Sequence, residues 1–290
     1  MTQDDTSRDN GVILVNVLVI LALTASIVFL MLTSQDRLIA RGRLAGNAAQ
    51  AEALAKAGEL SVLIALRRDM KTAPAEDHFA ENWASALQQA VELETGRYAV
   101  AVTDANSRFD VNRLAIGGLG DIQTLGRLMA ALDLPADYAT RIAAGIARGG
   151  ALGSIDQLAD LGLPPDAIAA LRPHLETLPV AGNVNLNTVG QVFLGVLLNN
   201  PAAANRLIRL RDTNGRLTAA DLAQMGVLAP PGSGYTSDVW DVVVSAETDG
   251  TQVRLTSRLV RFRGPGVRDV VVTSRRFGPE AGEIPGIPAQ

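Results

Sequence analysis

Four carboxylates lie close together near the C-terminal end of the sequence, and carboxylate oxygens are the ligands that calcium prefers: Asp238, Asp241, Glu247 and Asp249. A calcium ion takes about six to eight oxygens, and the loop at residues 229–237 could add backbone carbonyls. No EF-hand pattern is present. The same residues also fit the solvent face and turn of a β-hairpin. The sequence leaves both interpretations open, with calcium as the weaker one.

Other residues that carry chemistry are scarce. The chain has no cysteine, and its two histidines, His78 and His174, stand far apart in sequence. It contains no HExxH, G-x-S-x-G, P-loop or G-x-G-x-x-G pattern, so these hydrolase and nucleotide-binding classes are not indicated. Aromatic residues make up only 4% of the chain, which argues against an aromatic-lined groove. We therefore expect no enzyme, and no catalytic or cofactor-binding residues.

The most distinctive segment is an uncharged apolar run at residues 12–32, long enough as a helix to cross a bilayer core. A short polar leader, residues 1–11, precedes it and ends in Gly11. A secretory signal has a shorter apolar core with its small residue behind it, whereas here the glycine stands in front. This layout resembles the class III signal of type IV pilins and pseudopilins. It predicts that a prepilin peptidase cuts between Gly11 and Val12.

The charges around this run point in two directions. Arg37, Arg41 and Arg43 follow the run and the leader is acidic, so the positive-inside rule alone would put the large domain in the cytoplasm. The leader resemblance implies the opposite: a single-pass anchor in a bacterial inner membrane, with the bulk of the chain in the periplasm. We adopt the second orientation because the rest of the chain points to the same family.

The order of elements predicts an α+β fold. Outside a central helical block we expect a helix continuing from the apolar run to about residue 70, a helix at 81–94, and strands at 97–104, 239–247, 252–262 and 267–277. The last three strands form a meander whose first turn is Asp249-Gly250. The strand at 97–104 should join the same sheet, which would make the helical block an insertion.

The predicted domains follow from this order. They are a leader at residues 1–11, a transmembrane helix at 12–32, the first part of a pilin-like domain at 33–108, an inserted helical domain at 109–230, the C-terminal strands at 231–278 and a disordered tail at 279–290.

The helical block repeats itself, in copies at about residues 109–175 and 182–228. Ser154 and Thr218 begin matching segments in which a hydroxyl caps a short helix and a glycine ends it. Near the start of the copies we align Asn112 with Asn185. These residues and their polar neighbours are expected to make turn and cap hydrogen bonds: Asp110, Asn183 and Asn187. The unit looks like a SAM-like or helix-hairpin-helix bundle, present twice.

A helix-hairpin-helix unit raises the possibility of DNA binding, in which glycine-rich hairpins turn their amides toward phosphate. Each candidate hairpin here, at residues 161–163 and 225–227, has a single glycine. A basic cluster in the second copy is also typical of a solvated helix face: Arg206, Arg209, Arg211 and Arg216. A membrane-anchored DNA-binding protein of the competence type is therefore the alternative function. The net charge of −4 argues against it, and no nucleic-acid partner is expected.

Taken in order, the motifs resemble the K-type minor pseudopilins of the type II secretion system (general secretion pathway protein K). The matching positions are Gly11-Val12, Asn16 and the segments at 109–112, 153–158, 183–188 and 245–247. Most pilin-like proteins carry a glutamate where this chain has Asn16, and one class of minor pseudopilin lacks it. The resemblance implies a pilin-like N-terminal membrane helix and a small antiparallel sheet with a large, duplicated all-helical insertion.

The same resemblance implies a function in protein export across the outer membrane. Such proteins sit at the pseudopilus tip, where they initiate assembly and limit its length. The implied partners are minor pseudopilins of the I, J and H types, the inner-membrane secretion platform and prepilin peptidase. Some family members bind calcium, but none of their ligands can be matched to residues of this sequence.

Overall fold

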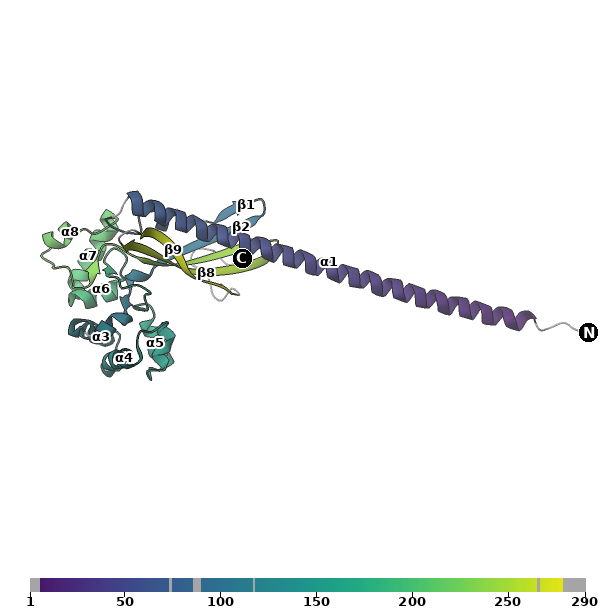
Figure 1. The fold of residues 1–290 in the computed structure, drawn as a ribbon, viewed down its shortest axis with the longest axis horizontal. Helices are drawn as coiled ribbons and strands as arrows, with labels where there is room; N and C mark the ends of the chain where they lie inside the picture. The colour runs from purple at the N-terminus through teal and green to yellow at the C-terminus, as the bar shows by residue number, and fades with distance from the viewer. Residues whose placement is uncertain (1–5, 73–74, 86–89, 117, 265–266, 279–290) are drawn as a thin grey trace, which may run out of the picture.

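The computed structural model describes residues 6–72, 75–85, 90–116, 118–264 and 267–278. A single helix, α1 (Thr6–Thr72), runs the length of the molecule as a rod of 67 residues. Its N-terminal part projects free of the folded body, and its C-terminal part lies on the sheet (Figure 1). The continuous helix to about residue 70 is confirmed, whereas the predicted tail at 279–290 lies outside the described residues.

The projecting part of α1 carries apolar side chains that are not covered by the folded body. Leu14, Leu21 and Phe29 are all more than half exposed, with Phe29 at 66%. Within the described part of the chain, α1 is the one helix long and apolar enough to cross a membrane, and none of its apolar stretch is buried in the fold. So much exposed apolar surface is costly in water, so this segment calls for a bilayer or a partner helix around it.

The sheet is antiparallel, with the order β1-β2-β7-β8-β9. Its strands are β1 (Val91–Leu93), β2 (Gly96–Asp104), β7 (Val239–Thr248), β8 (Thr251–Gly264) and β9 (Val267–Gly278). Strand β2 pairs with β7 from Arg97↔Glu247 to Asp104↔Trp240, as the insertion hypothesis requires. The predicted meander is confirmed too. Its first turn places Asp249 at φ 45° and Gly250 at φ 75°, the left-handed backbone of a type I′ hairpin.

One face of this sheet buries the C-terminal half of α1. Val62 and Leu66 of the helix pack into a cluster with Val242 and Leu259 of the strands, and all four are fully buried. The helix approaches closely because residue 58 is glycine, whose added Cβ would lie 2.7 Å from a methyl of Val244. A short helix, α2 (Asn82–Ser85), closes one end of this core with Trp83.

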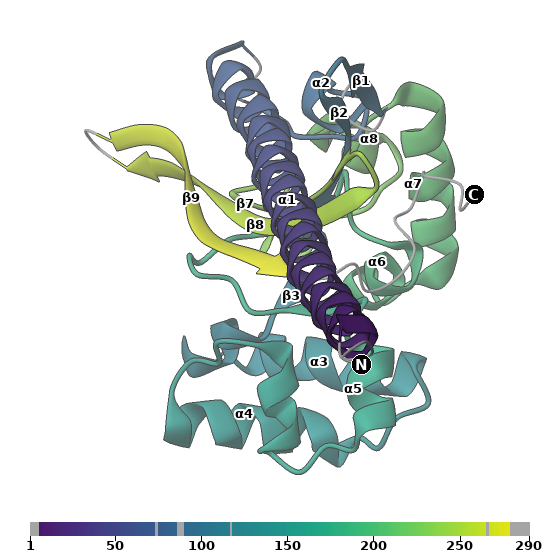
Figure 2. The same ribbon diagram turned by 90° about the vertical axis from the view of Figure 1, so that its right-hand side faces the viewer.

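The insertion between β2 and β7 is a separate helical body (Figure 2). Its longer helices are α3 (Leu119–Ala131), α4 (Asp137–Gly149), α5 (Pro165–Leu171), α6 (Gln191–Leu198), α7 (Pro201–Asn214) and α8 (Ala219–Gln224). Three 3₁₀ segments lie before and between them: Ala105–Ser107, Val111–Ile116 and Ile155–Ala159. The insertion has its own hydrophobic core, which includes Leu128, Ile142, Leu158, Phe193 and Leu207.

Each copy of the repeat is closed by a short parallel ladder that the sequence did not reveal. In the first, β3 (Phe109–Asp110) pairs with β4 (Leu175–Glu176); in the second, β5 (Val184–Asn185) pairs with β6 (Ser233–Gly234). Two-residue strands are too short to show an alternating pattern. The second copy therefore extends beyond the boundaries predicted at 228 and 230.

The expected helix at 81–94 is wrong. Helix α2 spans Asn82–Ser85, residues 86–89 lie outside the described ranges, and Val91–Leu93 is strand β1, which pairs with β2 across the turn before Gly96. Gly96 has φ +139°, and a Cβ there would lie 2.2 Å from the carbonyl of Glu247. Pairing with the sheet and this glycine turn override the helical propensity of the sequence.

Candidate functional site

The predicted processing site lies near the start of α1, within the helix. Asn16 follows just over one turn beyond Val12, on the projecting part of α1. Its amide lies among exposed apolar side chains such as Leu14 and Val17. A single uncharged polar group is far cheaper to hold in a bilayer than an unpaired carboxylate.

The four candidate calcium ligands are not gathered at one point. The carboxylate of Asp241 accepts from Nε and Nη2 of Arg258 at 2.7 and 2.9 Å. Asp238 accepts from Nε of Arg263 at 2.9 Å. Glu247 lies six residues beyond Asp241 on β7, about 20 Å away at the rise of a strand. It pairs with Arg97 at 2.8 Å, and this hydrogen bond lowers the pKa of Glu247.

Asp249 occupies the hairpin turn at the end of the same strand. The four residues therefore do not form one coordination shell, and the hairpin interpretation describes their contacts.

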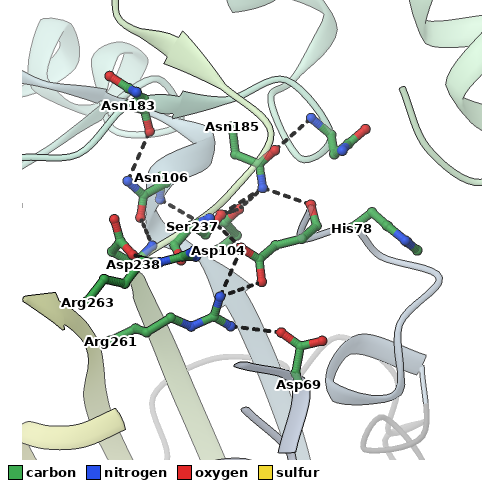
Figure 3. Close-up of polar contacts among 12 residues, drawn as sticks. Asp69, His78, Asp104, Asn106, Asn183, Asn185, Ser237, Asp238, Arg261 and Arg263 are labelled. Carbon is green, nitrogen blue, oxygen red and sulfur yellow. Dashed lines mark hydrogen bonds and ion pairs between the residues drawn. The ribbon is translucent and has the colours of Figure 1, made fainter. Parts of the chain in front are cut away.

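A different polar cluster stands where the sheet, the end of α1 and the insertion meet (Figure 3). We call it the joint. Its members come from segments far apart in sequence: Asp69, Asp77, Asp104, Asn106, Asn183, Asn185, Thr188, Ser237, Asp238, Arg261 and Arg263.

Arg261 is the charged centre of the joint. Its side chain is 0% exposed, with one nitrogen 2.9 Å from Asp69 and another 2.9 Å from Asp77. The guanidinium also lies over the ring of Trp240, 4.5 Å from its centroid. Burial raises the pKa of Asp77 to about 6, against the opposing pull of Arg261. Burial and the nearby charge of Glu81 raise the pKa of Asp69 to about 6 in the same way.

Asp104, the last residue of β2, is a fully buried carboxyl held by neutral donors. The hydroxyl of Ser237 donates to it at 2.5 Å, Asn185 Nδ2 donates at 3.2 Å, and the Thr188 hydroxyl also donates. The backbone N–H of Asn106 donates to its other oxygen at 2.8 Å. Burial raises the pKa of Asp104 to about 6 despite these hydrogen bonds.

Two asparagines tie the insertion to the sheet. Asn106 accepts from the backbone N–H groups of Asp238 and Val239, both at 3.0 Å, and donates to the carbonyl of Asn183 at 3.0 Å. Asn185 donates to the Asp77 carbonyl at 2.9 Å and to Ser237 Oγ at 2.7 Å. These hydrogen bonds all lie within the chain. They hold the inserted helical domain against the sheet and the end of α1.

Metal binding at the joint has one geometric candidate among the described residues. Carboxylate oxygens of Asp69, Asp77 and Glu81 lie within 4.8 Å of one another. Arg261 already pairs with the first two of them. The two hydroxyls beside the Asp104 carboxylate, those of Ser237 and Thr188, are buried and donate to it, so this part of the joint is closed to solvent.

The predicted turn and cap roles of the repeat residues are confirmed, with one correction to the alignment. Asp110 accepts from the N–H of Asn112 at 3.1 Å, and Asn185 accepts from the N–H of Asn187 at 2.9 Å. Asn112 in turn binds the N–H of Leu152, and Asn187 binds that of Leu217. Asn112 therefore corresponds to Asn187, not to Asn185. The caps at Ser154 and Thr218 are both complete capping boxes.

Sequence reasoning missed the centre of the joint. Along β8, Leu255, Ser257 and Leu259 point toward the α1 side, and Arg261 continues the same two-residue period. A charge at an inward position of an alternating strand was the available signal.

The basic cluster of the second copy is partly used within the fold. Arg211 donates to the carbonyls of Val189 at 2.8 Å and Leu186 at 3.3 Å, and Arg216 pairs with Glu76 at 3.1 Å. These contacts weaken the case for a phosphate-facing arginine row.

No family model matches the sequence, and no curated protein matches it. Among solved structures, the chain is similar to a chain of the GspK-GspI-GspJ complex from the type 2 secretion system of enterotoxigenic Escherichia coli. The TM-score is 0.62 with 20% sequence identity, and the match covers 83% of this chain and 100% of that chain. The predicted α+β fold, with an N-terminal apolar helix, an antiparallel sheet and added helices, is therefore confirmed as the fold of a chain in that complex.

Proposed function

We propose that this protein is a K-type minor pseudopilin of a type II secretion system. It stands at the tip of the pseudopilus, initiates assembly and limits length during protein export across the outer membrane. Before assembly it is anchored in the bacterial inner membrane by α1, with the folded body in the periplasm.

The observation that carries this proposal is the helix α1. One continuous rod joins an exposed apolar stretch at residues 14–32 to a C-terminal half packed on the sheet. Beyond the membrane stretch, Leu38, Ile39 and Leu44 remain exposed, from 55% to 64%. These three residues lie on different sides of the helix, and exposed apolar side chains of this kind suit packing against other long apolar helices. The solved complex that contains the chain of similar fold joins GspK, GspI and GspJ, which supports partners of the I and J types here.

Two features support the tip position. A shaft subunit is expected to pair its membrane glutamate with the amino terminus of the subunit above it. A tip subunit has none above, so Asn16 is sufficient. The insertion, from β3 to β6, is also a bulky body with its own core, and it would crowd the stacked subunits of a shaft.

A pull-down tests the proposal. The full chain, extracted in detergent, is mixed with pseudopilins I and J at low and high salt. Apolar helix packing should survive raised salt, which screens charge-driven contacts. Leu38→Glu should weaken the complex, and Lys56→Glu, on the same helix and half-exposed, serves as the control. If no complex forms at either salt, or labelled protein spreads evenly along the pseudopilus, the tip assignment is refuted.

The competence-type DNA receptor is not favoured. Arg211 donates to the carbonyl of Val189, and Arg216 pairs with Glu76, so both arginines have partners within the chain. Each capped turn ends in one glycine, Gly162 or Gly226. Salt-dependent retention on DNA would be the observation in its favour.

A further inference from the structure

The inserted domain has a hollow of about 440 Å³ where the first copy of the repeat meets the second. Helix α3 forms one wall, and α6 with the start of α7 forms the other. Its walls are mostly small and apolar. Exposed residues and two buried ones line them: Ala130, Ala131, Val192 and Pro201 are exposed, and Gly195 and Val196 are buried. Val192 is 47% exposed. The surface therefore offers an unfilled apolar trough between two helical walls.

Arg127 lines the same hollow and lacks a counterion. Its Nε is buried and has no acceptor, and its Nη2 donates to Thr124 Oγ1 at 3.0 Å. Among the described residues, three other arginines of the first copy pair with acids, whereas Arg127 and Arg148 do not: Arg113 with Asp121, Arg141 with Asp137 and Arg172 with Asp156. No acidic side chain within the described ranges pairs with Arg127. Arg127 as a whole is only partly buried, and its guanidinium carries further N–H donors that can meet an acceptor placed in the hollow.

We propose that this hollow docks a segment of a partner protein that places an apolar side chain between α3 and α6 and a carboxylate against Arg127. The apolar walls supply the hydrophobic contact, and the planar guanidinium supplies charge-assisted hydrogen bonds that match a carboxylate. Gly190, the cap of α6, has no side chain to accept from the first amides of that helix, so these donors favour the same charge.

The hollow lies apart from the surface assigned to α1. Helices α3 and α6 belong to the inserted body, beside the sheet and away from the projecting rod (Figures 1 and 2). A segment bound between α3 and α6 would leave the exposed side chains of Leu38 and Leu44 on α1 free for other partners. The inference therefore goes beyond the proposed assembly function, because it assigns the insertion a contact of its own.

The test uses the full chain in detergent. The sequence has no cysteine, so Ala131→Cys provides a single thiol for an environment-sensitive dye at the hollow. The probes are a short peptide with adjacent leucine and glutamate and its match with leucine and lysine. We expect the glutamate peptide to bind at least about tenfold more tightly, the effect of one charge-assisted pair. Arg127→Gln should remove that preference, and Arg127→Lys should retain part of it.

Arg148→Gln is the matched control, since this arginine of α4 donates only to the carbonyl of Ala144 and does not line the hollow. It should change nothing. Equal binding of both peptides, or binding of neither, overturns the proposal. Displacement of the peptide by free dodecanoate at lower concentration would assign the hollow to a small carboxylate instead. Self-association lost on Arg127→Gln would assign it to a second copy. A failed pull-down with pseudopilins I and J would leave all these peptide measurements unaffected.

Discussion

Replacing Arg261 by methionine should destabilise the protein in a way that depends on pH. The guanidinium is 0% exposed and pairs with Asp69 and Asp77, whose side chains are 9% and 1% exposed. Methionine fills similar space but leaves two buried carboxylates without a cation. Breaking a buried ion pair from one side costs about 3–5 kcal/mol, so we expect a loss of that order in the free energy of unfolding near neutral pH.

The sign of the pH effect follows from the two carboxyl groups. Both have pKa values of about 6 in the folded protein, above the 3.8 of an unfolded aspartate. A raised folded pKa gives stability that is present below the unfolded value and is lost as pH rises through the folded value. Without Arg261 these pKa values rise further. The cost of Arg261→Met should therefore be smallest near pH 4 and grow toward pH 8.

Urea unfolding of the full chain in detergent, followed by tryptophan fluorescence, measures this cost, because Trp240 lies against Arg261. Arg263→Met is the matched control: Arg263 pairs with Asp77 and Asp238 but is 34% exposed, so about 1 kcal/mol or less is expected. Asp77→Asn should rescue part of the loss in the double variant. Equal costs for the two arginine variants, or a cost that does not change with pH, would refute the assignment of Arg261 as the charged centre.

Four further predictions concern other parts of the chain. Mass spectrometry of membrane-extracted protein should find Val12 at the N-terminus, and an intact Met1 in a strain with active peptidase would contradict this. Asn16→Glu should be tolerated or mildly harmful in a secretion assay, whereas loss of the protein should reduce pseudopilus number or let pseudopili overgrow. Because burial raises the pKa of Asp104 to about 6, it contributes about 3 kcal/mol of stability at low pH that is lost as pH rises through 6; Asp104→Asn should flatten this part of a urea-unfolding pH profile. Thr218→Ala should cost about 1 kcal/mol in thermal unfolding through loss of the α8 cap, and Thr218→Ser should cost less.

The elements that could be predicted have local causes. The strands at Gly96–Asp104 and Val239–Thr248 alternate strongly enough to be predicted as strands, and the order of the elements placed them in one sheet. The caps at Ser154 and Thr218 were visible because a capping box lies within four residues. The prediction of a helix to residue 94 was wrong because Val91–Leu93 pairs with β2, and this pairing cannot be seen in the local sequence.

The joint could not be predicted, since its contacts are long-range. Arg261 meets Asp69 across 192 residues of sequence, and Asn185 meets Asp77 across 108. Only Arg261 carried a signal, as a charge at an inward position of its strand, and nothing in the sequence identified Asp69 or Asp77 as its partners. The misalignment of Asn112 with Asn185 has a similar origin, because three asparagines stand at alternate positions and only the bond to Leu217 shows that Asn187 is the equivalent.

The attachment of the insertion makes it a removable module. The chain leaves the sheet after Asp104 and returns before Trp240, and these two residues are directly paired neighbours. A tight turn could therefore join β2 to β7 in place of residues 105–238, giving a plain meander with no change of register. The α1–sheet core would keep its cluster around Val62 and Val242. In evolutionary terms, a helical body could be gained or lost here in one step, because a single hairpin separates the sheet with the insertion from the same sheet without it.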